Sequence, residues 1–576
     1  MKHKKTSTLL FALLATGVLG LTACKNGDGN GGKTDPAKTT LRVYSFTGGF
    51  GSQWLTRLAS AYEEKVKERS FEDGKTGVQV ITTAVKADVL GTAVPTSGYD
   101  VLFLEQHDFS ADVNNHYYAD ISDVVKEANP YDGGKAIESK MSDSQKEMFS
   151  VEGAYYALPH YATPFGIVYN IDLFEEKNYY LAKTPGDSNK LGSAAYFVND
   201  ANTERSLGPD GKAGTSDDGL PATYEEFWRL CDWIRQNNDN PIIFGGTDVL
   251  DTYVSFFANQ LAVDYAGYEQ TMLSYHFTGS ATKLATVQNG KLVMDESPTE
   301  ITVDNNDGKE LRRNAGYYYA LQFLSKMFSS FENASNPGYL YPSTFSSENY
   351  LTAQRDFIQR DDVAMLIDGM WSENEADEVG HSFAKGKTRD GRKIGWMPLP
   401  KATQEQVGEG QTFYDVYFPE CFVNASSQDG ALAAAKDFLR FAYSDAQLVD
   451  FTKTTGALKA VKYQIPETDL ASMNTYGRSV AALKNAECSG DGSVSFVYPL
   501  AGNSLYRNHH AYFDIVNASS GGMASSIQGT VHSHPALYLY QNKGTKADPS
   551  KGEKAYQDYF AGMYTYAANQ SFFSGR

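Results

Sequence analysis

The stretch Asp361–Asn374, with the sequence DDVAMLIDGMWSEN, is the feature that most constrains the fold. Its apolar run Val363–Ile367 is typical of a buried strand, Gly369 predicts a turn, and Trp371 then enters a helix. A strand that ends in a turn places the next side chains at the carboxyl edge of its sheet, where open α/β sheets bind ligands. Trp371 is therefore our first candidate for a ligand contact.

Two acids, Asp368 and Glu373, flank this tryptophan in the sequence. A carboxylate accepts hydrogen bonds from two sugar hydroxyls at once, and an adjacent aromatic ring covers the C–H face of a sugar. The alternative is that both acids cap the helix, because negative side chains are favoured at a helix N-terminus. We predict ligand contacts for both acids and keep capping as the alternative.

The N-terminal part of the chain alternates between strand and helix patterns. A strand pattern at Leu41–Phe46 precedes a glycine-rich turn and a helix whose apolar face contains Trp54. Further strand patterns follow at Val78–Thr83 and Val101–Leu104. This alternation predicts a parallel α/β sheet.

Length and composition narrow the class of protein. A chain of 576 residues is too long for one hydrophobic core, so we expect two or more lobes. Hydrophobic residues make up 41% and charged residues 21%, as in globular proteins. The net charge of −19 and the lack of a basic stripe exclude a nucleic-acid partner. The 38 tyrosines suit polar ligands with apolar faces such as sugars, although most of them must simply fill half-buried surface.

The first residues predict export and anchoring. A positive segment at Lys2–Lys5 precedes an apolar segment, Leu9–Leu21, that is too short to span a bilayer as a stable helix. The sequence Leu-Thr-Ala-Cys at 21–24 resembles the lipobox of bacterial lipoproteins, which implies a signal peptide at 1–23, cleavage before Cys24 and lipidation of that cysteine. Residues 24–40 then form a lipidated tether, and acyl chains on Cys24 hold the protein at the membrane, facing the outside. An uncleaved anchor or an ordinary secretory signal is the alternative, and either would still export the protein.

The strand, glycine and tryptophan of Asp361–Asn374 resemble those of extracellular solute-binding proteins that serve carbohydrate ABC transporters, the family that includes maltose-binding proteins. Three further stretches agree with that family in order: Gly153–Phe174, Ile394–Pro400 and Phe422–Gln447. The resemblance implies a type II periplasmic-binding-protein-like α/β fold with two lobes, each a mostly parallel sheet flanked by helices, joined by hinge crossings. It implies a monomeric, non-enzymatic receptor that captures a sugar or oligosaccharide in an interlobe cleft and delivers it to ABC permease subunits.

The resemblance also implies lobe boundaries and site positions. Residues 41–162 and 418–465 would form the first lobe, and residues 163–417 and 466–576 the second. The two prolines Pro159 and Pro164 oppose a helix and favour an extended hinge crossing. By position, the further candidates for ligand contact are Phe46, Trp54, Glu105, Gln106, Tyr161, Tyr414, Tyr417 and Tyr506. Core packing is at least as good an interpretation of Trp54, because it belongs to the apolar face of its helix.

A turn-rich insertion at 199–220 contains three aspartates, Asp210, Asp217 and Asp218, separated by glycines. Short carboxylates on a tight turn supply the oxygen ligands that Ca²⁺ prefers, and the loop resembles calcium-stabilised loops of other secreted proteins. The spacing is not that of an EF-hand, so a solvated loop without metal is the alternative. Structural calcium is the one cofactor that the sequence suggests.

Enzymatic alternatives centre on cysteine. Cys231, Cys421 and Cys488 cannot all pair with one another, so there is no disulfide framework. Thiamine-cleaving enzymes share the two-lobed fold and use a cysteine nucleophile, which makes a surface-anchored enzyme the alternative from another class. However, Cys231 falls on an apolar helix face and Cys421 in a strand, where cysteines are inert. A receptor for a peptide or polyol is the alternative within the binding class.

Overall fold

The computed structural model describes residues 34–498, apart from residues 87–89, 106, 108, 184–189, 192–194, 199–201, 246–248, 277, 289–290, 303–309, 312, 330–337, 342–348 and 418. Cys24, Gln106 and Tyr506 therefore lie outside the described residues. None of the helices in the described ranges is long and apolar enough to span a bilayer.

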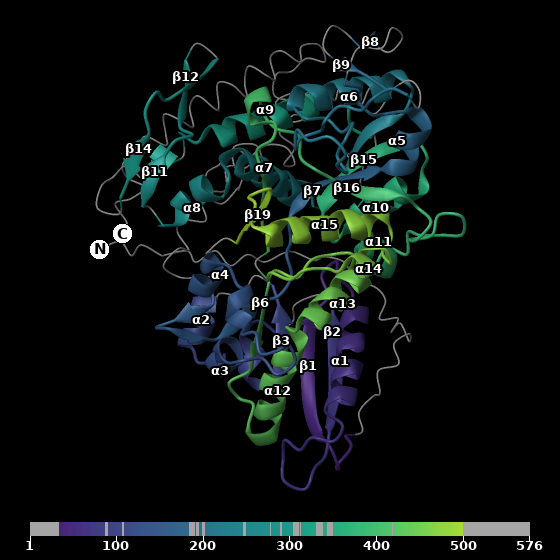
Figure 1. The fold of residues 1–576 in the computed structure, drawn as a ribbon. Helices are drawn as coiled ribbons and strands as arrows, with labels where there is room; N and C mark the ends of the chain where they lie inside the picture. Colours follow the sequence, from purple (N-terminus) through teal and green to yellow (C-terminus); the bar gives the residue numbers. More distant parts are fainter. Residues whose placement is uncertain are drawn as a thin grey trace, which may run out of the picture. The chain divides into compact units, whose positions relative to one another are not determined.

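Five strands form the first sheet, in the order β2-β1-β3-β18-β6 (Figure 1). β1 (Thr39–Phe46) runs parallel to β2 (Val78–Val85) and to β3 (Val101–Leu104). β18 (Glu420–Val423) runs antiparallel to β3 and to β6 (Ala157–Pro159). The parallel arrangement of the three N-terminal strands that the sequence predicted is thus confirmed.

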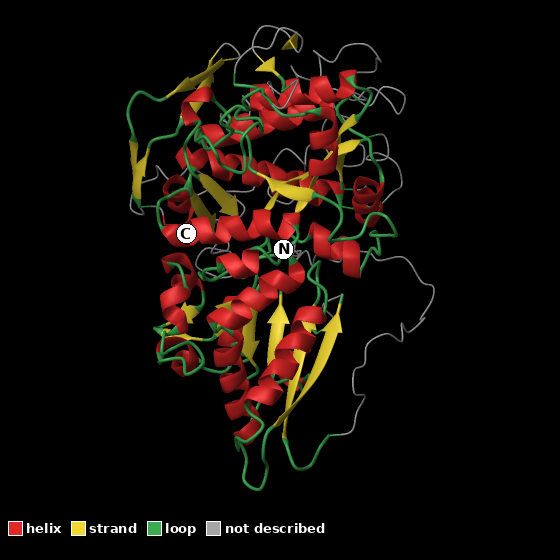
Figure 2. Cartoon of the chain, turned by 45° about the vertical axis from the view of Figure 1, so that its right-hand side comes forward, coloured by secondary structure: helices red, strands yellow, loops and turns green. Residues whose placement is uncertain are grey.

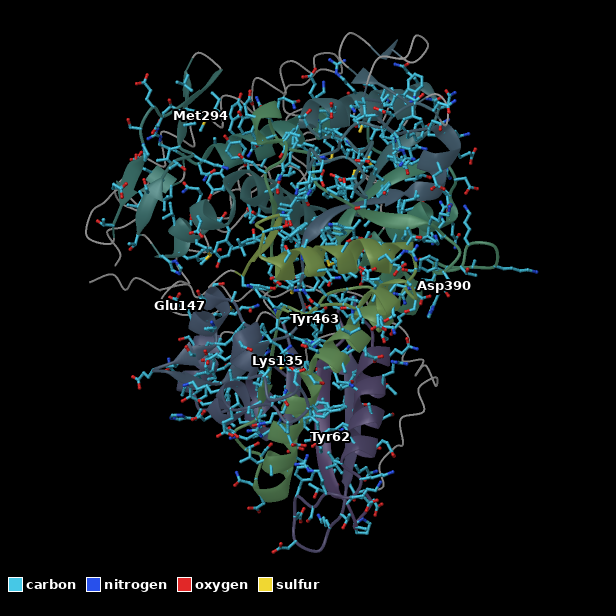
Figure 3. The ribbon with its side chains drawn as sticks, viewed as in Figure 1. Tyr62, Lys135, Glu147, Met294, Asp390 and Tyr463 are labelled. Carbon is cyan, nitrogen blue, oxygen red and sulfur yellow. The ribbon has the colours of Figure 1, made fainter. Side chains whose placement is uncertain are left out.

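Two long helices pack against this sheet. α1 (Gln53–Lys65) contacts β2, and α12 (Asp429–Ala442) contacts β1. α1 buries Trp54, Leu58 and Tyr62 because these residues recur at helical spacing on one face. The Tyr62 hydroxyl donates a hydrogen bond of 2.9 Å to Asp437 Oδ2, which joins α1 to α12 (Figure 3). The remaining helices of this part are α2 (Phe109–Asn114), α3 (Ser122–Lys126), α4 (Asp143–Met148), α13 (Asp445–Thr455), η1 (Gly91–Thr96) and η2 (Ile137–Lys140).

Four strands form the second sheet, in the order β10-β15-β7-β16. β15 (Val363–Gly369) runs parallel to β10 (Asn240–Phe244) and antiparallel to β7 (Phe165–Asn170), which in turn runs antiparallel to β16 (Ile394–Met397). All seven residues of β15 are buried, because the strand is central and both of its faces are covered. This explains the uninterrupted apolar run Val363–Ile367 within the strand. Both sheets are therefore mixed, and the expectation of a mostly parallel sheet in each lobe is wrong, because β18, β6, β7 and β16 add antiparallel pairs.

Helices surround the second sheet as well (Figure 2). α6 (Tyr224–Gln236) packs on β10, α10 (Tyr350–Gln359) on β15, and α15 (Thr475–Ser489) on β16. α6 begins after Thr223, since the Thr223 hydroxyl accepts a hydrogen bond from the Glu226 backbone N–H. The other helices are α5 (Ile171–Lys177), α7 (Leu250–Ala266), α8 (Tyr268–His276), α9 (Ala315–Ser329), α11 (Ser372–Glu378), α14 (Glu467–Leu470) and η5 (Gln404–Gln406).

Short strand pairs complete the described structure. They are β4 (Ser150–Val151) with β5 (Ala154–Tyr155), β8 (Lys190–Leu191) with β9 (Ala195–Tyr196), β11 (Gly279–Ala281) with β14 (Thr299–Ile301), β12 (Ala285–Gln288) with β13 (Lys291–Met294), and β17 (Gln411–Tyr414) with β19 (Val494–Val497). β17 and β18 follow one another closely in the chain but belong to different sheets. The β12–β13 hairpin exposes Val293 and Met294 at its end (Figure 3).

In the described chain, three segments pass between elements around the first sheet and elements around the second: residues 160–164 from β6 to β7, residues 415–419 from β17 to β18, and residues 456–463 between α13 and α14. The first segment contains no helix between Pro159 and Pro164, so the prediction that these prolines oppose a helix is confirmed. Hydrogen bonds tie the segments together. The Ala162 N–H donates to the Leu458 carbonyl at 2.8 Å, and Thr163 Oγ1 donates to Asp415 Oδ1 at 2.6 Å.

Candidate functional site

Trp371 stands between the carboxyl end of β15 and the first turn of α11, where it is the residue that precedes the helix. This is the position that the sequence predicted for it. Gly369, the last residue of β15, has to be a glycine because a Cβ there would overlap the indole of Trp371. Trp371 is only 4% exposed, so its ring lies against other side chains in this conformation.

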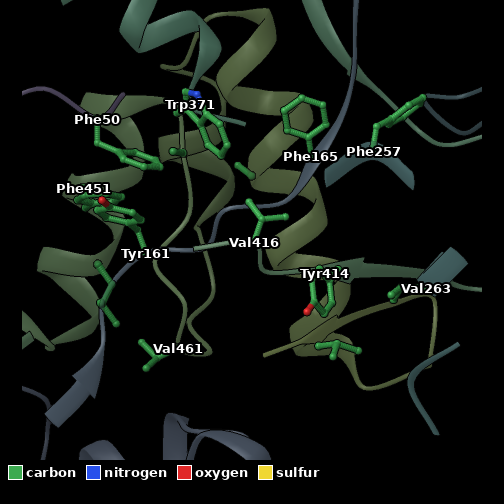
Figure 4. Packing of buried hydrophobic residues seen from close by; sticks show 14 of the residues in the cluster. Phe50, Tyr161, Phe165, Phe257, Val263, Trp371, Tyr414, Val416, Phe451 and Val461 are labelled. Carbon is green, nitrogen blue, oxygen red and sulfur yellow. The ribbon is translucent and has the colours of Figure 1, made fainter. Parts of the chain in front are cut away.

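Three aromatic side chains pack around Trp371 and a fourth, Tyr161, packs on one of them; we call these five residues the aromatic cluster: Phe50, Tyr161, Phe165, Trp371 and Tyr417. The ring centroids of Phe50, Phe165 and Tyr417 lie 6.4, 6.2 and 5.5 Å from that of Trp371. Tyr161 lies 3.9 Å from Phe50. Figure 4 shows Trp371 between Phe50 and Phe165. Phe165 begins the second sheet, whereas Phe50 follows the first strand of the first sheet, so residues near the edges of both sheets contribute to the cluster.

The turn that follows β1, residues 47–52, covers Trp371. A Cβ at Gly49 would overlap the indole, so the backbone of the turn lies directly against the ring. Asn374 Nδ2 donates a hydrogen bond of 3.2 Å to the Gly49 carbonyl, and the Ser52 N–H donates one of 3.0 Å to Glu378 Oε2. A ligand that stacks on Trp371 must therefore separate this turn from α11.

Two carboxylates lie buried beside the cluster, on Asp368 of β15 and Glu375 of α11. The Gln354 side chain on α10 joins them, because its Nε2 donates to Asp368 Oδ2 at 2.9 Å and to Glu375 Oε2 at 3.0 Å. Burial, followed by the negative charge of Glu375, raises the pKa of Asp368 to about 7. Burial also raises the pKa of Glu375, although Lys86, whose Nζ lies 3.4 Å from it, opposes that shift.

A third carboxylate reaches the same place from the first sheet. Glu105 follows β3 and accepts a hydrogen bond from the Tyr161 hydroxyl. Burial raises the pKa of Tyr417, and the charges of Glu105, Glu375 and Asp368 add to the shift. The Tyr417 hydroxyl is thus close to carboxylates from both sheets.

Other predicted residues lie elsewhere. Glu373 is buried in a salt bridge with Arg389, 3.0 Å long, and accepts a 2.7 Å hydrogen bond from Asn474 Nδ2. Trp54 packs in the core of the first sheet, 5.2 Å from Phe103 and 5.4 Å from Phe451.

Tyr414 and Phe46 are two more predicted residues that the structure describes. Tyr414 places its hydroxyl 3.2 Å from that of Tyr275, and its backbone N–H donates to Gln260. Phe46 is partly buried at the end of β1, packed against the core.

The sequence reasoning did not identify Phe50, Gln354 or Glu375 as site residues. A signal for Glu375 was present, because it lies four residues after Trp371 and so shares its side of the helix. Phe50 stands in the glycine turn at the carboxyl end of a predicted strand, the position that made Trp371 a candidate. Gln354 gave no local signal, since only the packing of α10 on β15 brings it to the site.

Residues 53–449 match the sequence model of bacterial extracellular solute-binding proteins. The chain belongs to this family. Among solved structures it is similar to a chitin oligosaccharide binding protein, with 15% identity, a TM-score of 0.50, and coverage of 92% of this chain and 99% of the other. This likeness shows the fold: the solute-binding protein has the two-lobed α/β fold of type II periplasmic binding proteins, with one of the two sheets in each lobe.

Two further structures resemble this solute-binding protein. One is the bacterial solute receptor AcbH, with 12% identity, a TM-score of 0.48, and coverage of 93% of this chain and 100% of the other. The second is a binding protein of an ABC transporter from Bifidobacterium animalis subsp. lactis in complex with mannobiose, with 12% identity, a TM-score of 0.48, and coverage of 92% and 95%. No curated protein matches the chain.

The three cysteines among the described residues are unsuited to nucleophilic catalysis. Burial raises the pKa of the Cys421 thiol to about 12, raises that of Cys231 well above its ordinary value, and also raises that of Cys488. A raised pKa removes the thiolate, which is the reactive form. The enzyme alternative therefore receives no support from these residues.

The aspartate-rich loop holds its shape through its own hydrogen bonds. Asp217 accepts bonds from the Asp210 N–H and from Thr215 Oγ1, at 3.0 and 2.6 Å, while Asp218 accepts one of 2.7 Å from the Gly214 N–H. Within the part of the chain that the structure describes, no group of three His, Cys, Asp or Glu side chains is arranged to hold a metal ion. Calcium binding by Asp210, Asp217 and Asp218 remains a hypothesis.

Removal of divalent cations tests the calcium hypothesis. If calcium stabilises the loop, EDTA lowers the midpoint of thermal unfolding, and added Ca²⁺ restores it, because a ligand of the folded state stabilises that state. The same titration on Asp217→Asn provides the control, since this variant has lost a ligand. An identical midpoint with and without EDTA in the original protein removes calcium from the account.

Proposed function

We propose that this solute-binding protein is a lipid-anchored receptor that captures a sugar or oligosaccharide between its two lobes and delivers it to an ABC permease. It would act as a monomer and without catalysis. The observation that supports the proposal is the aromatic cluster, in which Trp371 lies among rings from both sheets beside three carboxylates.

The chemistry of this cluster suits a saccharide. Aromatic rings cover the apolar C–H face of a sugar, while carboxylates accept hydrogen bonds from its hydroxyl groups. Ordinary core packing accounts less well for the arrangement, because buried carboxylates destabilise a protein unless they are paired. Asp368 and Glu375 share a neutral glutamine amide, and the basic group that the structure shows near them, Lys86, is half exposed.

Capture would proceed by closure of the lobes about the three crossing segments. A ligand that contacts both lobes binds the closed form more tightly and shifts the population towards it. The lobes in this mechanism are the predicted ones, residues 41–162 with 418–465 and residues 163–417 with 466–576. The contacts between the turn 47–52 and α11 are those that a ligand would replace or bridge.

A thermal-shift screen against mono- and oligosaccharides tests the proposal. A sugar that binds only the folded protein at one hundred times its Kd stabilises it by about 2.7 kcal/mol, which raises the unfolding midpoint. We expect one class of saccharide to raise the midpoint and to be recovered unaltered. If only peptides or polyols raise it, the protein is a receptor for another solute, and if the sugar is recovered cleaved, the protein is an enzyme.

Substitution of the lipidation cysteine tests the anchor. We expect Cys24→Ala to release most of the protein from the membrane fraction of producing cells into the medium, because the proposed anchor consists of acyl chains on this one residue. Cys488→Ala is the matched control, since it removes a cysteine remote from the N-terminus and should leave the protein with the membrane. Retention of the Cys24→Ala protein in the membrane fraction would refute the anchor.

A further inference from the structure

We propose that the solute carries a positively charged amino group, and that Asp368 and Glu375 bind it. The ligand would then be a saccharide with a free ammonium group, as in an amino sugar, rather than a neutral sugar. This inference rests on the proposed function, because it specifies the chemistry of the ligand at the same site. It is carried by the balance of charges and hydrogen-bonding groups around the aromatic cluster.

The charges at the site do not balance. Asp368 and Glu375 are 0% and 4% exposed, so both carboxylates are buried. Lys86 is the basic group that the structure places against them, with Nζ 3.4 Å from Glu375 Oε1. The side chain of Lys86 is 49% exposed and also contacts Tyr350, so solvent screens its charge. An additional cation bound between the two buried carboxylates would neutralise their excess negative charge.

The hydrogen-bonding groups are also unequal, with a surplus of acceptors. Gln354 uses its amide nitrogen for both carboxylates, and its Oε1, which is buried, has no hydrogen-bond partner. Asn374 also has an unpaired acceptor. Its side-chain nitrogen donates to the Gly49 carbonyl, while its buried Oδ1 has no hydrogen-bond partner. Buried acceptors without donors are uncommon in folded proteins. An ammonium group offers three donors and no acceptor, so it matches this surplus better than a hydroxyl, which also brings an acceptor.

The electrostatic state of the two acids agrees with a missing cation. Burial raises the pKa of both groups, and the charge of Glu375 adds to the shift at Asp368. A buried carboxylate pair is unfavourable while both members are ionised, and a bound cation offsets that repulsion. The aromatic cluster adds a further preference, because the faces of Trp371 and Tyr417 attract cations as well as C–H groups.

Matched ligands provide the test on the full-length protein. Glucosamine and galactosamine, and the β-1,4-linked glucosamine disaccharide, are compared with the corresponding 2-hydroxy sugars and 2-acetamido sugars by calorimetric titration. The three members of each set differ only at one substituent on each ring, and only the first carries a charge. We expect the amino form to bind at least tenfold more tightly than both neutral forms.

Variants then assign the preference to the two acids. Asp368→Asn and Glu375→Gln keep the shape of each side chain and remove its charge, and we expect each to lower the preference for the amino form about tenfold. Asp377→Asn is the matched control, because Asp377 lies on the same helix but pairs with Arg389 and is 40% exposed. It should keep the preference of the original protein.

The outcomes separate this inference from the proposed function. Equal or tighter binding of a neutral sugar overturns the ammonium proposal and leaves the sugar receptor intact. A preference for the amino form that survives both site substitutions overturns the assignment to Asp368 and Glu375. If none of the saccharides binds, the proposed function and the inference fall together. Should the variants fail to fold, the comparison of charged and uncharged ligands on the original protein still decides the ammonium proposal.

Discussion

Replacement of Trp371 by alanine is expected to weaken saccharide binding at least tenfold, which corresponds to about 1.4 kcal/mol. The indole is the central ring of the aromatic cluster, in contact with rings of both lobes, and its removal takes away the surface on which a sugar ring would stack. Calorimetric titration with the saccharide found by thermal shift measures the loss. Affinity unchanged within twofold would remove Trp371 from the binding site.

A second buried tryptophan supplies the control for this variant. Trp228 lies on α6, where it packs 4.6 Å from Phe323 and 5.1 Å from Tyr339 and makes no contact with the aromatic cluster in the described structure. Both Trp→Ala changes leave a cavity and lower the free energy of unfolding by about 3–5 kcal/mol. Only Trp371→Ala should also lower the affinity for the saccharide. An equal loss of affinity in both variants would indicate a general effect of destabilisation.

Replacement of Lys459 by methionine is expected to stabilise the protein, by about 1–4 kcal/mol at pH 7. Lys459 lies in the crossing segment 456–463 and is 3% exposed, and burial and the Cys421 thiol, not a described carboxylate, determine the pKa of its amino group. Its Nζ instead lies 2.6 Å from His160 Nδ1 and near the rings of Trp54 and Phe451. A methionine of similar length keeps the aromatic contacts and removes from the core an ionisable amino group whose described hydrogen-bond partner is the neutral His160 ring.

The dependence of stability on pH identifies the cause. Burial lowers the pKa of Lys459 from 10.5 to about 7, so between these pH values the unfolded chain binds a proton that the folded protein lacks. The free energy of unfolding therefore rises with pH across this window, by up to about 1.4 kcal/mol per pH unit. Burial and the charge of Lys459 also lower the pKa of His160, so acidification below its ordinary value of 6.5 destabilises the protein further. Cys421 and Tyr443 are the other titratable groups close to Lys459.

Urea unfolding at pH 7 and pH 9 measures this prediction. The gain in stability from Lys459→Met should be larger at pH 7 than at pH 9, because the unfolded original protein must release the lysine proton on folding, and this release costs less free energy as the pH rises. Lys401→Met is the matched control, since Lys401 is equally buried but pairs with Asp264 at 3.1 Å. Its replacement should destabilise the protein by about 3–5 kcal/mol. A Lys459→Met variant less stable than the original protein at both pH values would contradict the account.

The sequence was most informative where a local pattern carries the structure. The run Val363–Ile367 is uninterrupted because β15 is covered on both faces, and the glycine at 369 is needed because Trp371 lies against its Cα. These features predicted the strand, the turn that follows it and the position of Trp371 at the start of the next helix. The spacing of Trp54, Leu58 and Tyr62 likewise predicted the buried face of α1.

Contacts between distant segments could not be predicted in the same way. Glu373 and Glu375 are both acids in the first turn of α11, yet one pairs with Arg389 and the other joins Asp368 through Gln354. That difference depends on the side of the helix and on residues far away along the chain. The same reason explains why Tyr414 and Tyr417, three residues apart, lie in different surroundings: one is bonded to Tyr275, and the other packs on Trp371.

The most direct test of a saccharide site at Trp371 is a fluorescence titration of the original protein and of Trp371→Phe. The chain contains five tryptophans, and only Trp371 belongs to the aromatic cluster. We predict that the saccharide changes the tryptophan emission of the original protein, and that the phenylalanine variant still binds by calorimetry but loses most of that change. An emission change of the same size in both proteins would contradict a saccharide stacked on Trp371.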